Sequence, residues 1–69
     1  MYKYEIIIYW SDEDNAFIAD IPELPGCMSD GETPKKALEN AEIIMREWIE
    51  VATELGREIP IPKGRLKYA

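Results

Sequence analysis

The sequence predicts a small α+β domain in which one long helix packs against an antiparallel β-sheet. Three observations predict it: two alternating stretches near the N-terminus, a stretch rich in proline and glycine from Ile21 to Thr33, and a long helical pattern after it. A chain of 69 residues has room for about three or four strands and one helix. We therefore expect a single domain spanning residues 1–69.

Two strands joined as a hairpin are expected first. From Tyr2 to Trp10, aromatic and β-branched residues recur at every second position, which is typical of a strand. The other face of this strand becomes apolar towards its end, so we expect it to be partly covered as well. The polar turn at residues 11–15 leads into a second alternating run at residues 16–21, and this spacing favours an antiparallel hairpin.

The stretch after the hairpin is expected to be a set of turns with a short third strand at residues 27–29. Pro22 and Pro25 cannot lie in a central strand, because proline lacks the backbone N–H that pairs strands. Gly26 favours a turn with positive φ, and Gly31 is expected to permit a second tight turn. Thr33 followed by Pro34 is the pattern of a helix N-cap and first helical residue.

The helix is expected from Pro34 to Leu55, with Gly56 as its left-handed cap. At 100° per residue, its apolar residues form one stripe that should face the sheet. The stripe contains Ala37, Leu38, Ala41, Ile44, Met45, Trp48, Ala52 and Leu55. Trp48 and Met45 are interpreted as residues of the core or of a dimer interface.

The opposite side of the helix is acidic around one isoleucine. Ile43 is surrounded by Glu39, Glu47 and Glu50, with Lys36 and Glu54 further along. One interpretation is an apolar anchor with an acidic rim that contacts a protein; the other is a singly exposed isoleucine, which is common. Like-charge pairs at these spacings destabilise a helix by about a few tenths of a kcal/mol, which a basic partner would relieve.

Composition limits the function further. The net charge is −6, with 14 acidic and 8 basic residues and no histidine. This balance opposes binding to phosphate backbones and suits solubility or a basic partner. The single Cys27 cannot form an internal disulfide, and no Cys or His cluster is available for metal binding, so no cofactor is expected. No signal peptide or membrane-spanning run is present, and the expected location is the cytoplasm.

Two further interpretations concern acidic residues and the C-terminus. Glu5, Asp20 and Glu42 are the only carboxylates that suggest a metal-dependent nuclease. Their positions in the strand and helix patterns do not converge, so the chain is not expected to be an enzyme. After Pro60 and Pro62, a basic tail at residues 63–69 contains a candidate fourth strand at residues 65–68, which is interpreted as an edge strand guarded by lysine.

The motifs described above resemble the HicB antitoxin family over nearly the whole chain. They are the segment Asp12–Cys27 that ends in Pro-Glu-Leu-Pro-Gly-Cys, the Gly-Glu-Thr at residues 31–33, the segment Ala37–Ala41, and Gly-Arg-Glu-Ile-Pro-Ile-Pro at residues 56–62. The resemblance implies a partial ribonuclease-H-like fold in the order β-β-β-α-β, in a homodimer or tetramer. It also implies an antitoxin that covers the active surface of a HicA-like toxin, a small basic protein that cuts mRNA.

On this reading, Glu39, Ile43, Glu47 and Glu50 are expected to form part of the toxin-binding surface. Many family members carry a C-terminal DNA-binding domain, but too few residues follow Pro62 to form one. Direct DNA binding is therefore not expected. The alternative is a stand-alone HicB-like structural or ligand-sensing domain without a toxin.

Overall fold

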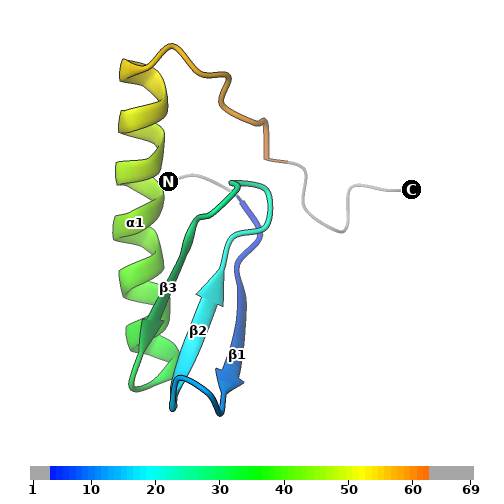
Figure 1. Cartoon of the computed structure of the whole chain (residues 1–69), viewed down its shortest axis with the longest axis vertical. Coiled ribbons are helices and arrows are strands. Elements are labelled where there is room, and N and C mark those ends of the chain that lie inside the picture. The colour runs from blue at the N-terminus through cyan, green and yellow to red at the C-terminus, as the bar shows by residue number, and fades with distance from the viewer. Residues whose placement is uncertain (1–3, 63–69) are drawn as a thin grey trace, which may run out of the picture.

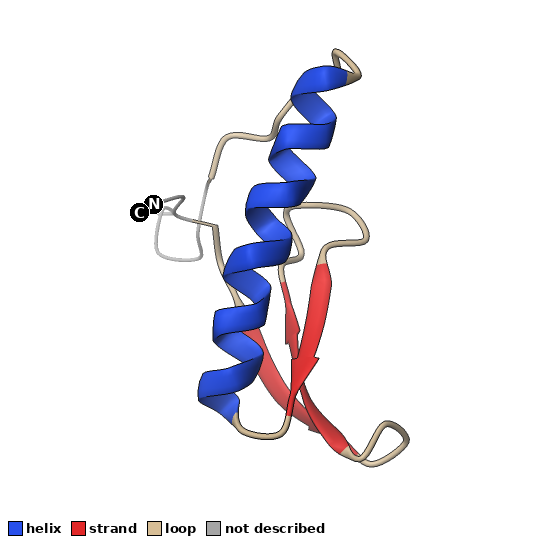
Figure 2. Ribbon diagram, turned by 90° about the vertical axis from the view of Figure 1, so that its left-hand side faces the viewer, coloured by secondary structure: helices blue, strands red, loops and turns tan. Residues whose placement is uncertain are grey.

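A computed structural model describes residues 4–62 of the chain. It contains β1 (Ile7–Ser11), β2 (Ala16–Asp20), β3 (Met28–Gly31) and α1 (Pro34–Glu54), in that order. The three strands form one antiparallel sheet, and α1 lies along one side of it (Figures 1 and 2). The predicted α+β class is confirmed. The candidate fourth strand at residues 65–68 lies outside the described residues.

The sheet register follows from the alternation in the sequence. β1 pairs with β2 so that Ile8 lies opposite Ala19, and β2 pairs with β3 so that Ala19 lies opposite Ser29. Directly opposed residues point to the same face of a sheet. Ile8, Ala19 and Ser29 therefore face α1, and their neighbours along each strand face the opposite side.

The segment between β2 and β3 is a compact loop that contributes to the core. The N–H of Ile21 donates to the carbonyl of Cys27 at 3.0 Å, and the N–H of Leu24 donates to the carbonyl of Ile21 at 3.0 Å. Gly26 has φ of 77°, as its position in the predicted turn requires. Leu24 is fully buried, so the loop places an apolar side chain into the core.

Gly31 differs from the prediction. It ends β3 and does not have positive φ. A Cβ at this position would lie 2.4 Å from the backbone nitrogen of Ala37. Glycine is therefore required because the first turn of α1 approaches β3 closely, and not because a tight turn requires its backbone freedom.

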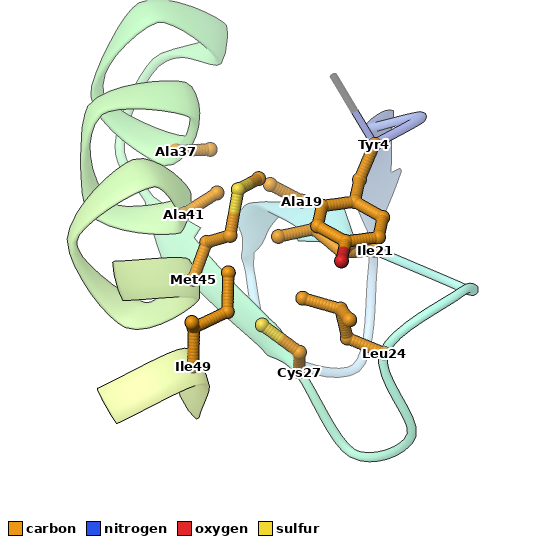
Figure 3. Close-up of a cluster of buried hydrophobic side chains, with 9 residues drawn as sticks. All are labelled: Tyr4, Ala19, Ile21, Leu24, Cys27, Ala37, Ala41, Met45 and Ile49. Atoms are coloured by element: carbon orange, nitrogen blue, oxygen red, sulfur yellow. The ribbon is translucent and has the colours of Figure 1, made fainter. Parts of the chain in front are cut away.

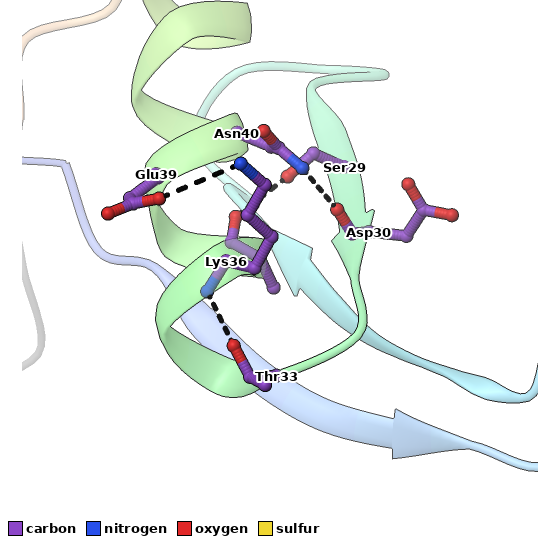
Figure 4. Close-up of polar contacts among 7 residues, drawn as sticks. Ser29, Asp30, Thr33, Lys36, Glu39 and Asn40 are labelled. Atoms are coloured by element: carbon purple, nitrogen blue, oxygen red, sulfur yellow. Dashed lines mark hydrogen bonds and ion pairs between the residues drawn. The ribbon is translucent and has the colours of Figure 1, made fainter.

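The ends of α1 match the sequence signals. The Thr33 side chain accepts a hydrogen bond from the N–H of Lys36 at 3.0 Å, and Pro34 follows it (Figure 4). Gly56 has φ of 71° just beyond the helix. Two further contacts hold the N-terminal turns of α1 to the sheet: Ser29 Oγ donates to the carbonyl of Ala37 at 3.0 Å, and Asn40 Nδ2 donates to the carbonyl of Asp30 at 2.8 Å.

The core lies between α1, the helix-facing side of the sheet and the loop after β2 (Figure 3). Its buried members are Tyr4, Ala19, Ile21, Leu24, Cys27, Ala37, Ala41, Met45 and Ile49. Two of the four helix residues in this cluster, Ala37 and Ala41, are alanines, whose small side chains let the helix backbone approach the strands. The Tyr4 hydroxyl donates to the carbonyl of Pro60, which connects the segment after α1 to the start of the sheet.

Two residues of the predicted apolar stripe do not belong to the core. Leu38 is 36% exposed and Leu55 is 62% exposed, whereas Ile49, which the stripe omitted, is buried. Ala37 makes the close approach to β3, so Leu38 is turned about 100° away from that contact. Leu55 follows the last helical residue. Ile49 lies one turn beyond Met45 and is covered by the cluster that includes Leu24.

Candidate functional site

The predicted partner-binding residues share one exposed face of α1. Glu39, Ile43, Glu47 and Glu50 are all exposed, and their spacing places them on the side opposite the core. Ile43 is 45% exposed, a large fraction for an isoleucine in the middle of a helix. These four residues are called the helix face below.

The electrostatics of the helix face are unfavourable for the chain alone. Lys36 forms an ion pair with Glu39 at 3.9 Å (Figure 4), but within residues 4–62 neither Glu47 nor Glu50 forms one. No basic residue occupies the last turn of α1. Because the C-terminal end of a helix is partially negative, Glu54 in the last turn raises the free energy of the helix, and Glu47 and Glu50 add like-charge repulsion at i,i+3 and i,i+4 spacing. A cationic partner would lower it.

Val51 extends the apolar part of the helix face and was missed by the sequence reasoning. It is 51% exposed and lies four residues after Glu47 and eight after Ile43. Together with Glu47, Trp48 and Arg57 it lines a shallow hollow beside the helix face. Trp48 is half-buried, and its Nε1 donates to the carbonyl of Pro25 at 3.0 Å. The eight-residue spacing of Ile43 and Val51, which places both on neighbouring parts of the helix surface, could have indicated this apolar extension, but the predicted apolar stripe did not include Val51.

A second surface, also missed, lies on the side of the sheet that α1 does not cover. Tyr9 lies opposite Ile18 and Ile18 opposite Asp30; in the next row, Ile7 lies opposite Asp20 and Asp20 opposite Met28. Tyr9 is 45% exposed and Met28 is 48% exposed. These six residues are called the open sheet face. The sequence analysis indicated the apolar part of this face only by noting that the second face of the first strand becomes apolar towards its end.

The acidic and basic residues are unevenly distributed along the chain, which the net charge alone does not show. Between Tyr4 and Pro34 there is no lysine or arginine. The same segment holds the acidic residues Glu5, Asp12, Glu13, Asp14, Asp20, Glu23, Asp30 and Glu32. The described part of the sheet and its loops is therefore acidic throughout, and every lysine and arginine of the described residues belongs to α1 or the segment after it.

The structure does not bring the candidate catalytic carboxylates together. Asp20 belongs to the open sheet face, whereas Glu42 lies on α1, which packs on the other side of the sheet. The Glu23 carboxylate accepts from the backbone N–H of Glu5 at 3.4 Å. Within residues 4–62, no three or more His, Cys, Asp or Glu side chains are placed to share a metal ion.

Cys27 is a packing residue, as predicted. It is 1% exposed and belongs to the core cluster. Burial raises the pKa of its thiol, and the negative charge of Asp20 raises it further. A raised pKa keeps the sulfur protonated, and the thiol is a much weaker nucleophile than the thiolate.

An apolar centre with a charged rim, on a small rigid domain, is typical of a surface that binds another protein. The helix among the described residues is not long and apolar enough to cross a membrane.

Comparison with known proteins gives the family. Residues 4–68 match the family described as HicB-like antitoxin of bacterial toxin–antitoxin system. The match spans nearly the whole chain, so the chain belongs to the HicB-like antitoxin family, and the resemblance found in its motifs is confirmed. Membership gives it a role in a toxin–antitoxin system.

Two relatives agree with this assignment. The chain is 40% identical to the UPF0150 protein Ta0767 of Thermoplasma acidophilum over 58 residues, which cover 84% of this chain and 83% of that protein. It is 39% identical to the UPF0150 protein ssl0259 of Synechocystis over 58 residues, which cover 84% of this chain and 78% of that protein. No solved structure matches the chain.

Proposed function

We propose that this chain is the antitoxin of a type II toxin–antitoxin pair and neutralises a basic, HicA-like, mRNA-cleaving toxin by binding it and covering its active surface. The single observation that carries the proposal is the family match over residues 4–68. The net charge of −6 agrees with a basic partner. The expected site of action is the cytoplasm, where mRNA is the substrate of the toxin.

The helix face is the proposed toxin contact. Ile43 supplies an exposed apolar anchor, and Glu47 and Glu50 supply negative charges that no ion pair within residues 4–62 neutralises. Lysine or arginine of the toxin would pair with these glutamates while an apolar toxin residue covers Ile43. Such pairs are more favourable when the contact excludes water around them.

Inhibition of RNA cleavage tests the function. The purified chain is added in increasing amounts to a HicA-like toxin, for which a small basic protein encoded next to its gene is the first candidate to examine, and cleavage of an RNA substrate is followed. We expect cleavage to stop near the ratio at which a complex forms on gel filtration. Undiminished cleavage at molar excess, with no complex, would contradict the antitoxin role and favour a stand-alone HicB-like domain.

A charge reversal tests the contact. The double variant Glu47→Lys, Glu50→Lys is expected to weaken the complex by more than the roughly 0–1 kcal/mol typical of an exposed ion pair. The matched control is Glu32→Lys, Glu58→Lys, which changes the net charge equally at exposed residues outside both surfaces. Equal dissociation constants for the two double variants would move the interface away from the helix face.

Self-association is proposed as well. A domain of 69 residues gains stability by burying more surface in a dimer or tetramer. Sedimentation equilibrium of the chain without toxin would establish the number of copies, and a monomer at all concentrations would exclude this part of the proposal.

A further inference from the structure

The open sheet face is an apolar surface that the described residues leave uncovered. Its two rows hold Ile7, Tyr9, Ile18 and Met28 at neighbouring positions across the three strands. α1 packs on the other side, where Ser29 Oγ bonds to the carbonyl of Ala37 (Figure 2). Ile18 is 8% exposed but lies outside the main core cluster, so it forms the floor of a separate apolar patch.

The composition of this patch is that of a protein contact. Tyrosine and methionine are enriched at protein interfaces. Tyr9, Ile18 and Met28 line a shallow hollow, into which a side chain of a partner fits. Methionine adapts its shape to different neighbours because its side chain is unbranched and flexible.

The charged groups of the patch are all acidic. Asp20 lies on the central strand between Ile7 and Met28, Asp30 lies on the edge strand β3, and Asp14 lines the hollow beside Tyr9. No lysine or arginine occurs between Tyr4 and Pro34, so no cation of the sheet or its loops offsets these charges. The negative potential over the face is therefore set by several carboxylates acting together.

The negative charge of the open sheet face favours some kinds of binding partner over others. Nucleic acid and anionic lipid surfaces are repelled by a carboxylate rim. A second copy related by a two-fold axis would place the same acidic rim against itself, which opposes pairing. A protein surface with lysine or arginine around an exposed apolar side chain complements both the rim and the hollow.

We propose that the open sheet face is a second binding surface for the basic toxin, separate from the helix face. The identity of the partner rests on the proposed function, whereas the location of the surface rests on the charge and the uncovered apolar residues. The two surfaces lie on opposite sides of the domain, so one toxin molecule that covers the helix face leaves the open sheet face free. One chain then binds two toxin molecules.

Stoichiometry and affinity test the proposal through two matched substitutions. Met28→Glu and Ile43→Glu each introduce one negative charge at apolar residues of similar exposure, 48% and 45%. The probe is a catalytically inactive variant of the HicA-like toxin, titrated by calorimetry into the full chain. Circular dichroism melts of both variants verify that they fold.

We expect the wild-type chain to bind two equivalents of toxin and each variant to bind one. Asp30→Lys, which reverses a rim charge at an exposed residue, is expected to weaken the Met28-dependent site about tenfold or more. The wild-type chain could instead bind one equivalent of toxin. If Met28→Glu abolishes that binding and Ile43→Glu leaves it unchanged, the result supports the open sheet face as a toxin-binding surface and contradicts the helix-face contact.

Four results would overturn the proposal. Toxin binding that is unchanged in Met28→Glu and Asp30→Lys would do so while leaving the antitoxin role intact. Complete absence of binding by the wild-type chain would contradict the antitoxin role together with this surface. Dissociation of a homodimer by Met28→Glu, or nuclear Overhauser contacts between the Met28 methyl group and residues 63–69 in the free chain, would assign the face to another occupant.

Discussion

At the scale of single residues, Leu24 shows how much one side chain in a loop contributes. Its side chain is fully buried between the sheet and α1 although it lies between two prolines in a turn-rich segment. Leu38 lies within a regular helix and is 36% exposed. The Leu24 side chain is therefore buried because of where its loop lies in the fold, and not because it belongs to a helix or strand.

The two leucines form a matched pair for measuring this difference. We expect Leu24→Ala to lower the free energy of unfolding by about 2–5 kcal/mol, because it removes buried methyl groups and leaves a cavity. Leu38→Ala is expected to change it by less than about 1 kcal/mol. Urea denaturation of both variants measures the difference, and equal losses would contradict the observed burial.

The thiol of Cys27 gives a pH-dependent prediction. Folding raises its pKa above the ordinary value of 9.0, mainly by burial. The folded chain therefore holds the thiol proton more tightly than the unfolded chain does. The stability this group contributes is complete below the unfolded pKa and is lost as pH rises through the raised folded pKa.

We accordingly expect the wild-type chain to lose more stability between pH 7 and pH 10 than the Cys27→Ala variant, which lacks the thiol. Chemical denaturation at the two pH values measures this. Labelling with a thiol reagent at pH 8 is expected to be at least ~100-fold slower in buffer than in denaturant, because reaction requires the core to open. Rapid labelling of the native chain would refute the buried position.

At the scale of elements, α1 combines two opposing features. Its first turns are fixed by the Thr33 cap, by Asn40 on the carbonyl of Asp30, and by the close approach of Ala37 to Gly31. Its last turn carries no basic residue and ends with Glu54. The helix is thus well fixed where its first turns meet the sheet, and electrostatically unfavourable at its C-terminal end, where Glu54 adds to the charge of Glu50.

Reversal of one charge at that end should stabilise the chain. Glu54→Lys removes repulsion with Glu50, creates a favourable i,i+4 pair with it and places a cation at the negative helix end. We expect the free energy of unfolding to rise by about 0.5–1 kcal/mol at low salt and by less at high salt. Thermal melts at two salt concentrations test this, with Glu54→Gln as an intermediate control. No gain in Glu54→Lys at low salt would show that the helix end is not under electrostatic strain.

At the scale of the whole molecule, charge is separated along the chain. The segment from Tyr4 to Pro34 is acidic and lacks lysine and arginine, while the described cations all follow it. We expect such a separation to direct the proposed basic toxin towards the sheet and its loops during diffusion. We expect the apolar residues of the two proposed surfaces to determine how long that complex lasts.

This division of roles is measurable. We expect the association rate constant with the toxin to fall about tenfold or more between 50 and 500 mM NaCl. The Met28→Ala variant should dissociate faster with the same salt dependence of association, because it removes apolar contact and no charge. Stopped-flow fluorescence measures both constants. An association rate that is independent of salt would contradict electrostatic steering.

The sequence by itself determined the elements and the family. Alternation predicted β1 and β2, the Thr33-Pro34 and Gly56 signals bounded α1 to within a residue, and the motif around Leu24 to Cys27 indicated the HicB-like family before any comparison. These features are local: each depends on backbone preferences and spacing within a few residues. They could therefore be inferred without knowing how the elements meet.

Only the tertiary structure decided which side chains the elements cover. Helical periodicity placed Leu38 and Ile49 on nearby sides of α1. Because α1 approaches β3 most closely where Ala37 meets Gly31, Leu38 is left exposed. Ile49 is buried in the cluster that includes Leu24. The sequence indicated only that a second face of the first strand becomes apolar; which residues form the open sheet face depends on how the three strands pair and on which side α1 occupies. Contacts between residues distant along the chain set these outcomes, and no local pattern encodes them.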